Sequence, residues 1–154
     1  MQSLRDHVVA NLRGGQAYDT FESITCEFKP QERGVVPAGA GHSAWQILEH
    51  IRISQRDILD FSRNENGDYK EKKWPDEYWP KEAAPADPAA WDRSIKAYQT
   101  NLADFEALVT DPKRDLFAPF PWGDGQTLLR EALMADDHAG YHLGQLVMVK
   151  RLLG

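Results

Sequence analysis

The amino-acid sequence predicts an all-α protein, built as a four-helix bundle with long loops that are rich in aromatic residues and proline. Three observations carry this prediction. Apolar residues recur at intervals of three and four, helix-start signals stand before three of the periodic segments, and glycine or proline separates them. No segment alternates as a half-buried strand does. A length of 154 residues suits one core, so we expect a single domain over residues 1–154.

The N-terminal part predicts one helix and a shorter helical piece. The first helix is expected over roughly Gln2–Arg13, where the pair Gly14-Gly15 interrupts it. A short helix is expected within Asp19–Glu27. The segment Phe28–Gly41 contains two prolines and three glycines and is expected to be a loop.

The second long helix has the clearest start signal. Ser43 is followed three residues later by Gln46, the pattern of a capping box in which each residue bonds the other's backbone amide. Apolar residues at helical spacing continue the helix to about Ser62: Trp45, Leu48, Ile51, Ile58 and Leu59. The next segment, Arg63–Ala86, combines prolines with aromatic residues, so we expect a loop that its rings hold against the bundle.

The third and fourth long helices follow the same logic. Asp87 and Pro88 are expected as the N-cap and first helical residue, and Asp111-Pro112 ends that helix. Its apolar residues alternate by four and three, which is typical of a bundle seam: Trp91, Ile95, Tyr98, Leu102, Phe105 and Val109. Thr127 is expected to cap a final helix that runs to about Leu153.

Charge and hydropathy exclude two classes of partner. The formal net charge is −6 and no cluster of lysine and arginine stands out. Nucleic-acid binding needs a basic face that neutralises phosphates, so we expect no nucleic-acid partner. No apolar run approaches the roughly 20 residues that span a bilayer, and the N-terminus lacks the apolar stretch of a signal peptide. We therefore expect a cytoplasmic protein with no membrane partner.

Cys26 is the only cysteine, so an internal disulfide is impossible, which fits a reducing compartment. A catalytic cysteine needs a neighbouring base, and the sequence offers none beside it. We expect a half-buried structural thiol at this position.

Three histidines form the candidate site. His138 and His142 are four residues apart, so a helix presents both imidazoles on one face. His50 lies within the apolar stripe of the second long helix, where a ring nitrogen needs a partner. One divalent metal would satisfy all three rings and keep open coordination positions, the arrangement of a catalytic site. The alternative is a pair of exposed polar residues together with one core histidine bonded to protein groups.

Other polar residues carry weaker signals. Asp57 lies two helical turns after His50 and either orients a ligand or is a solvated charge. Tyr141 is expected to be a packed ring. His42 is expected to serve the turn before Ser43, and His7 has no other histidine or cysteine near it.

Two segments resemble a known family. DHAGYHLGQL at 137–146, followed by a basic, leucine-rich end, resembles the last helix of the DinB-like superfamily, which includes the YfiT-type proteins. HSAWQILEH at 42–50 is similar to the second-helix motif of that family. The resemblance implies an up-down-down-up four-helix bundle, often paired as a homodimer. It also implies a divalent metal, zinc or nickel, on His50, His138 and His142.

The resemblance implies a function as well. Relatives include transferases and isomerases that use a low-molecular-weight thiol, so a metal- and thiol-dependent transferase acting on a small molecule is expected. Aromatic residues of the loops would shape the electrophile pocket: Trp74, Trp79, Phe117, Phe120 and Trp122. The sequence identifies no general base. Two alternatives stay open: a non-catalytic metal-binding or stress-response bundle, and a bundle whose histidines only pack and whose function is association.

Overall fold

A computed structural model describes residues 1–154 and contains only helices as regular elements. They are α1 (Gln2–Leu12), α2 (Phe21–Thr25), α3 (Ala44–Ser62), α4 (Ala90–Thr110) and α5 (Leu128–Leu153). A single isolated bridge between Pro119 and Thr127 is the only β pairing. The all-α prediction is confirmed. None of the helices is both long enough and apolar enough to cross a membrane.

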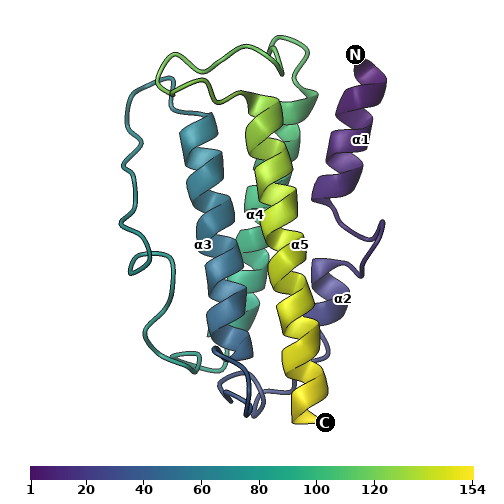
Figure 1. Cartoon of the computed structure of the whole chain (residues 1–154), viewed down its shortest axis with the longest axis vertical. Helices are drawn as coiled ribbons and strands as arrows, with labels where there is room; N and C mark the ends of the chain where they lie inside the picture. Colours follow the sequence, from purple (N-terminus) through teal and green to yellow (C-terminus); the bar gives the residue numbers. More distant parts are fainter.

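The four long helices form an up-down-down-up bundle (Figure 1). α1 and α5 run in one direction, while α3 and α4 run in the other. The short helix α2 follows α1 on the same side of the bundle. Since α3 and α4 are parallel, the chain must return along the length of the bundle between them. The loop 63–89 makes this return on the outside of α3.

Side-chain caps define two of the helix starts where the sequence predicts them. The Ser43 hydroxyl accepts a bond from the Gln46 amide at 3.2 Å, and the Gln46 side chain accepts one from the Ser43 amide at 3.1 Å. Thr127 accepts a bond from the amide of Arg130 at 3.2 Å.

The predicted start of α4 is wrong by two residues. The Asp87 carboxylate accepts a bond from the Ala89 amide at 2.9 Å, and the Asp87 carbonyl accepts one from the Ala90 amide at 3.1 Å. These bonds close a tight turn over 87–89, so the α-helical pattern begins only at Ala90.

Two apolar clusters stabilise the bundle, one in each half. The cluster nearer the C-terminus of α5 contains Trp91, Leu48 and Leu146, and the other contains Phe105 and Leu59. Between them α3 and α5 carry buried or half-buried polar residues in place of apolar ones. His138 lies next to this zone, whereas His50 and His142 are flanked in the sequence by residues of the first cluster.

The long loop is held against α3 by its aromatic residues, as the sequence predicts. The Tyr78 hydroxyl donates to the Asp57 carboxylate at 2.6 Å, and the Tyr69 hydroxyl donates to the same oxygen at 3.3 Å. Trp79 stacks on the ring of His50 with 3.8 Å between centroids. Trp74 is the exception, because its side chain remains 70% exposed.

Arg5 joins the first helix to the end of α4. Its side chain is only 5% exposed, and its guanidinium donates to the backbone carbonyls of Val109 and Arg114. The carbonyl of Val109 belongs to the last turn of α4, where no intrahelical donor remains. Arg5 therefore closes this end of the bundle.

We expect Arg5→Met to lower the free energy of unfolding by roughly 2–4 kcal/mol, because a charged donor is lost and two buried carbonyls lose their partner. Urea denaturation of the metal-free protein measures the change. Arg13→Met is the matched control, since Arg13 pairs with Glu106 at 2.7 Å but is 63% exposed. We expect a much smaller loss from the control, because an exposed ion pair contributes little to stability. Equal losses in the two variants would show that Arg5 has no special role.

Candidate metal centre

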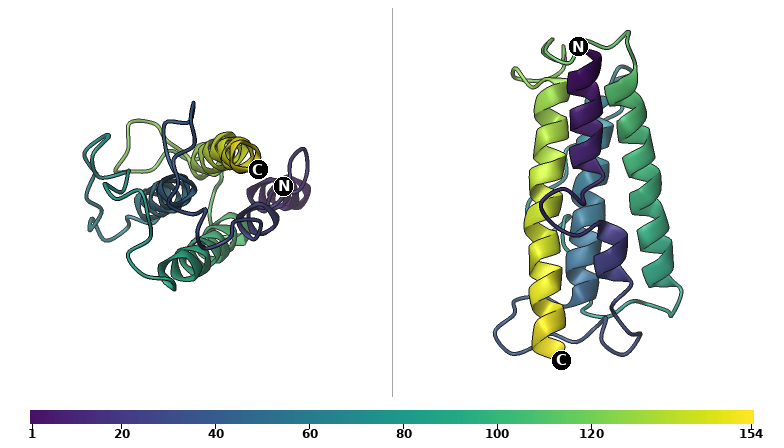
Figure 2. Two further views of the ribbon diagram at one scale, coloured as in Figure 1. Left: turned by 90° about the horizontal axis from the view of Figure 1, so that it is seen from below. Right: turned by 90° about the vertical axis from the view of Figure 1, so that its right-hand side faces the viewer.

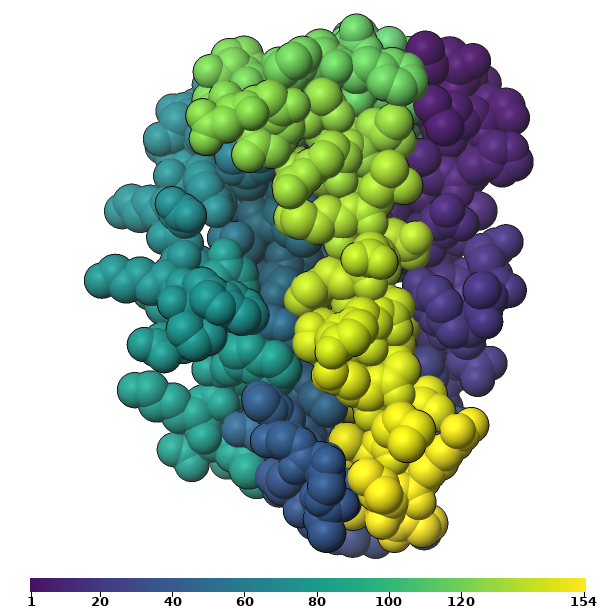
Figure 3. All heavy atoms as spheres, in the orientation of Figure 1, coloured from purple at the N-terminus to yellow at the C-terminus, as the bar shows by residue number.

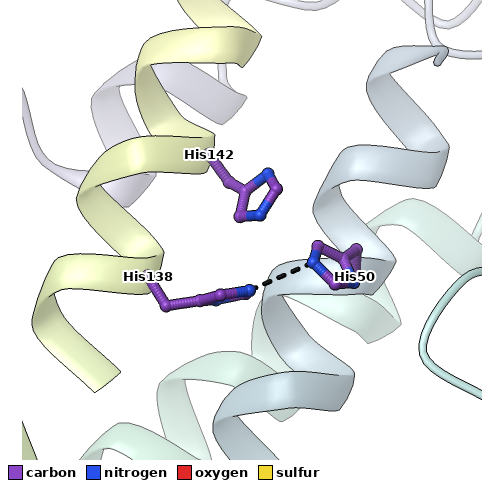
Figure 4. A group of neighbouring side chains, drawn as sticks. All are labelled: His50, His138 and His142. Atoms are coloured by element: carbon purple, nitrogen blue, oxygen red, sulfur yellow. Dashed lines mark hydrogen bonds between the residues drawn. The ribbon is translucent and has the colours of Figure 1, made fainter. Parts of the chain in front are cut away.

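Three histidines from two helices converge on one point. His50 lies on α3, whereas His138 and His142 lie one turn apart on α5 (Figure 4). One nitrogen from each ring lies within 4.8 Å of the corresponding atoms of the other two. The rings of His50 and His142 are buried and that of His138 is half-buried. The structure thus brings together the three residues that the sequence selects.

The protonation site of His50 is determined by the long loop. Its Nδ1 lies 3.0 Å from the backbone carbonyl oxygen of Tyr78. A carbonyl oxygen only accepts hydrogen bonds, so Nδ1 carries the proton and Nε2 keeps its lone pair. Nε2 lies 3.0 Å from Nε2 of His138.

His142 is oriented in the same way by its own helix. Its Nδ1 lies 2.8 Å from the side-chain oxygen of Gln145, which can only accept. The Nε2 atom of His142 therefore keeps its lone pair as well. A metal-binding histidine needs this type of partner on its outer nitrogen, since the partner fixes both tautomer and ring orientation.

Aromatic rings enclose the histidines. Trp79 lies nearly parallel to His50, at an interplanar angle of 7°, and presents its ring to His142 at 5.8 Å. Tyr141 contacts His142 edge-on, with 4.9 Å between ring centroids. The stacked Trp79 ring covers one face of His50 and keeps water from it.

Burial keeps the rings neutral. Loss of solvent, together with the repulsion of neighbouring imidazoles, lowers the pKa of His50 to about 4 and that of His138 to about 4. Burial also lowers the pKa of His142. At pH 7 all three rings therefore have lone pairs available.

The donor set fits one divalent metal. Two nitrogens that bind the same ion at about 2.0–2.1 Å each are about 3 Å apart when they subtend roughly a right angle. The two Nε2 atoms of His50 and His138 have that separation. The His142 ligand atom lies within 4.8 Å of both, so all three rings are grouped around one point.

The structure selects between the two expectations for Asp57 and overturns those for Tyr141 and Cys26. Asp57 is 9% exposed and is not a solvated charge; it holds Tyr78, whose carbonyl orients His50. Tyr141 is 67% exposed, so the expectation of a packed ring is wrong. Its neighbours on the same turn, rather than Tyr141 itself, face the bundle interior. Cys26 is exposed, not half-buried, because it follows the last turn of α2 on the solvent side.

Sequence reasoning missed two residues. His42 stacks against Trp79 with 3.9 Å between ring centroids and so lies next to the centre. Gln145 orients His142, and the signal that could have identified it is its spacing of three residues on the same helix face.

Of the five loop aromatics, Trp79 alone both stacks on a candidate histidine and lines a cavity next to it. Phe120 and Trp122 stack on each other, and Phe120 contacts Phe61 at the opposite end of α3. Phe117 is 51% exposed. The loop before α5 therefore covers the end of the bundle and not the histidines.

The fold and the site define a class of protein: an all-α bundle whose three-histidine group could hold a divalent metal. The family model of the DinB superfamily matches residues 15–146. The chain therefore belongs to the DinB superfamily, and the matched range includes His50, His138 and His142. No curated protein and no solved structure is significantly similar to the chain.

The histidine pKa values predict how the metal-free protein responds to pH. In the unfolded chain a histidine titrates near pH 6.5, whereas folded His50 and His138 titrate near 4. Between these values the unfolded state binds more protons, so stability is complete above about pH 6.5 and is lost as pH falls towards 4.

We expect the urea midpoint of the metal-free protein to fall between pH 7 and pH 5, and to fall less in a His50→Gln, His138→Gln double variant. His7→Gln is the matched control, because it replaces an exposed histidine on α1 that lies outside the centre. An equal pH dependence in the parent and the double variant would contradict the lowered pKa values.

Proposed function

We propose that the chain binds one divalent metal, zinc or nickel, through His50, His138 and His142, and uses it in thiol-dependent transfer to a small molecule. The observation that carries the proposal is the convergence of three neutral imidazoles, two of which, His50 and His142, already have their outer nitrogens paired with acceptors. Three protein donors leave coordination positions for a ligand, which distinguishes a catalytic site from a closed structural one.

The donor set supports the choice of metals. Imidazole nitrogen suits zinc and nickel, and a thiolate is a soft ligand that both accept. A metal at this position supplies Lewis-acid activation, which lowers the pKa of a coordinated thiol and yields a nucleophilic sulfur near neutral pH.

The residues of the chain prepare the centre. The Tyr78 carbonyl and the Gln145 side chain keep the proton on Nδ1 of their histidines, so that Nε2 is available. Trp79 covers one face of His50 and excludes water there. The other side of His142 lines a cavity through which a small molecule can approach. The electrophilic carbon would enter from this side.

The first test is metal content, measured by mass spectrometry on protein purified without an affinity tag. We expect about one zinc or nickel ion per chain. His50→Ala, His138→Ala and His142→Ala should each lose it, because two imidazoles make an incomplete site. His7→Ala is the matched control and should keep the metal.

The same samples test turnover. We expect the loaded parent to accelerate the attack of a thiol on 1-chloro-2,4-dinitrobenzene, which forms the thioether and releases chloride and a proton. Glutathione and bacillithiol are the thiol probes, and the three alanine variants should lose the acceleration. Metal binding without acceleration by either thiol would favour the non-catalytic metal-binding bundle. A parent that binds no metal would exclude both functions.

We expect Gln145→Leu to weaken metal affinity about 10–100-fold, because His142 loses the acceptor that fixes its tautomer. Competition with a chromophoric chelator measures the affinity. Gln99→Leu removes an exposed glutamine on α4, which bonds Glu22 at 3.2 Å, and should leave the affinity unchanged. A Gln145→Glu variant keeps an acceptor for Nδ1 of His142. If its metal affinity equals that of the parent, the effect of Gln145→Leu comes from the lost acceptor and not from altered packing.

A further inference from the structure

A cavity of about 620 Å³ lies on one side of the histidine centre. It is bounded by the second half of α5, the turn 39–42 and Trp79, and His142 forms part of its wall. Figure 3 shows the face of the molecule where the long loop, the turn before α3 and α5 border this hollow. A volume of this size is in the range that holds small organic ligands, about 300–1,000 Å³.

The wall of the cavity is apolar and uncharged. It contains no aspartate, glutamate, lysine or arginine. Its larger side chains include Trp79, Tyr141 and Met148, which offer two aromatic rings and an adaptable thioether. Tyr141 and Met148 are more than half exposed in the structure, so the hollow is open to solvent.

Gly144 provides an independent observation. It lies within α5 and lines the cavity, and a Cβ atom added to it would meet nothing within 4 Å. Glycine destabilises a helix interior relative to alanine, and here no neighbouring atom requires it. A side chain at this position would extend into the open space at the cavity wall.

Gln145 adds one directional group. Its side-chain oxygen is used by His142 at 2.8 Å, which leaves its amide NH₂ as a donor at the cavity wall. A ligand with an acceptor oxygen could therefore bond Gln145 while its ring contacts Trp79 and Tyr141.

The neighbouring cavities have a different character. One of about 510 Å³ is lined by Asp57, Asp60, Arg63, Lys70 and Lys72 among others, and one of about 530 Å³ includes Glu131 and Arg130. Neither is lined by any of the three histidines. Of these three cavities, only the one beside His142 is lined by a candidate histidine.

We propose that this cavity binds an uncharged aromatic small molecule, held between Trp79, Tyr141 and Met148. Resting on the proposed function, the inference assigns the class of the electrophilic substrate. The rings of Trp79 and Tyr141 favour a ligand with an aromatic ring. The absence of charged side chains disfavours a ligand that carries a charge.

The probe is N-phenyl-1-naphthylamine, an uncharged aromatic dye that fluoresces in apolar surroundings. We expect one dye to bind per chain, and its anionic analogue 1-anilinonaphthalene-8-sulfonate to bind at least 10-fold more weakly. Gly144→Phe should fill the cavity and weaken dye binding at least 10-fold. Leu133→Phe is the matched control, because Leu133 is an exposed residue on α5 outside the cavity.

Met148→Glu is a second variant that leaves the helix glycine in place. It adds a charge to the wall and should also weaken the dye at least 10-fold, whereas Leu133→Glu should not. Circular dichroism confirms that each variant is folded. Equal binding by the parent, Gly144→Phe and Met148→Glu would overturn the proposal, as would equal affinity for the two dyes. So would a parent dimer that Gly144→Phe converts to a monomer, since a second copy of the chain would then occupy the cavity.

The metal measurement separates this inference from the proposed function. Gly144→Phe should retain the metal content of the parent, because its side chain lies outside the set of three histidines. If Gly144→Phe loses dye binding and retains the metal, the result supports the cavity as a binding site that is separate from the metal centre. Dye binding by a parent that holds no metal would support the cavity and contradict the proposed function.

Discussion

The antiparallel packing of α3 against α5 is the constraint on which the site depends. The two helices contact each other along the middle of the bundle, and each turns its histidines towards the same seam. A rigid helix fixes the direction of a side chain better than a loop does. A shift of either helix by one turn would separate His50 from the pair on α5.

The return loop 63–89 orients and covers His50, which the helices alone do not do. A parallel pair of neighbouring helices requires a long connection, and here that connection contributes to the centre. Asp57 holds the hydroxyl of Tyr78, the carbonyl of Tyr78 holds Nδ1 of His50, and Trp79 covers the ring. A loop anchored at several points gives an imidazole a defined tautomer, which apolar packing alone cannot give.

The centre interrupts an otherwise apolar interior. Apolar clusters occupy both halves of the bundle, and His50 and His142 lie among the residues of the one nearer the C-terminus of α5. Burial lowers the pKa of the imidazoles and disfavours their charged form. Their lone pairs are therefore free at neutral pH, and the folded state loses stability as the pH falls. The family match covers residues 15–146, a range that includes the three histidines that the structure brings together.

Much of the fold and the donor set could be predicted from the sequence, because those features depend on local signals. The capping box at Ser43, the cap at Thr127 and the spacing of His138 and His142 are set by neighbours within one turn. The start of α4 was wrong by two residues, since the bonds of Asp87 form a turn that its sequence does not distinguish from a helix cap.

The sequence by itself determined the helices, their order and which three histidines could share a metal. Only the tertiary structure decided that the Tyr78 carbonyl orients His50, that Trp79 covers it and that an apolar cavity opens beside His142. Each of these contacts joins residues from separate elements. Helical periodicity specifies which face a residue occupies, but the partner across the interface depends on how the whole chain packs.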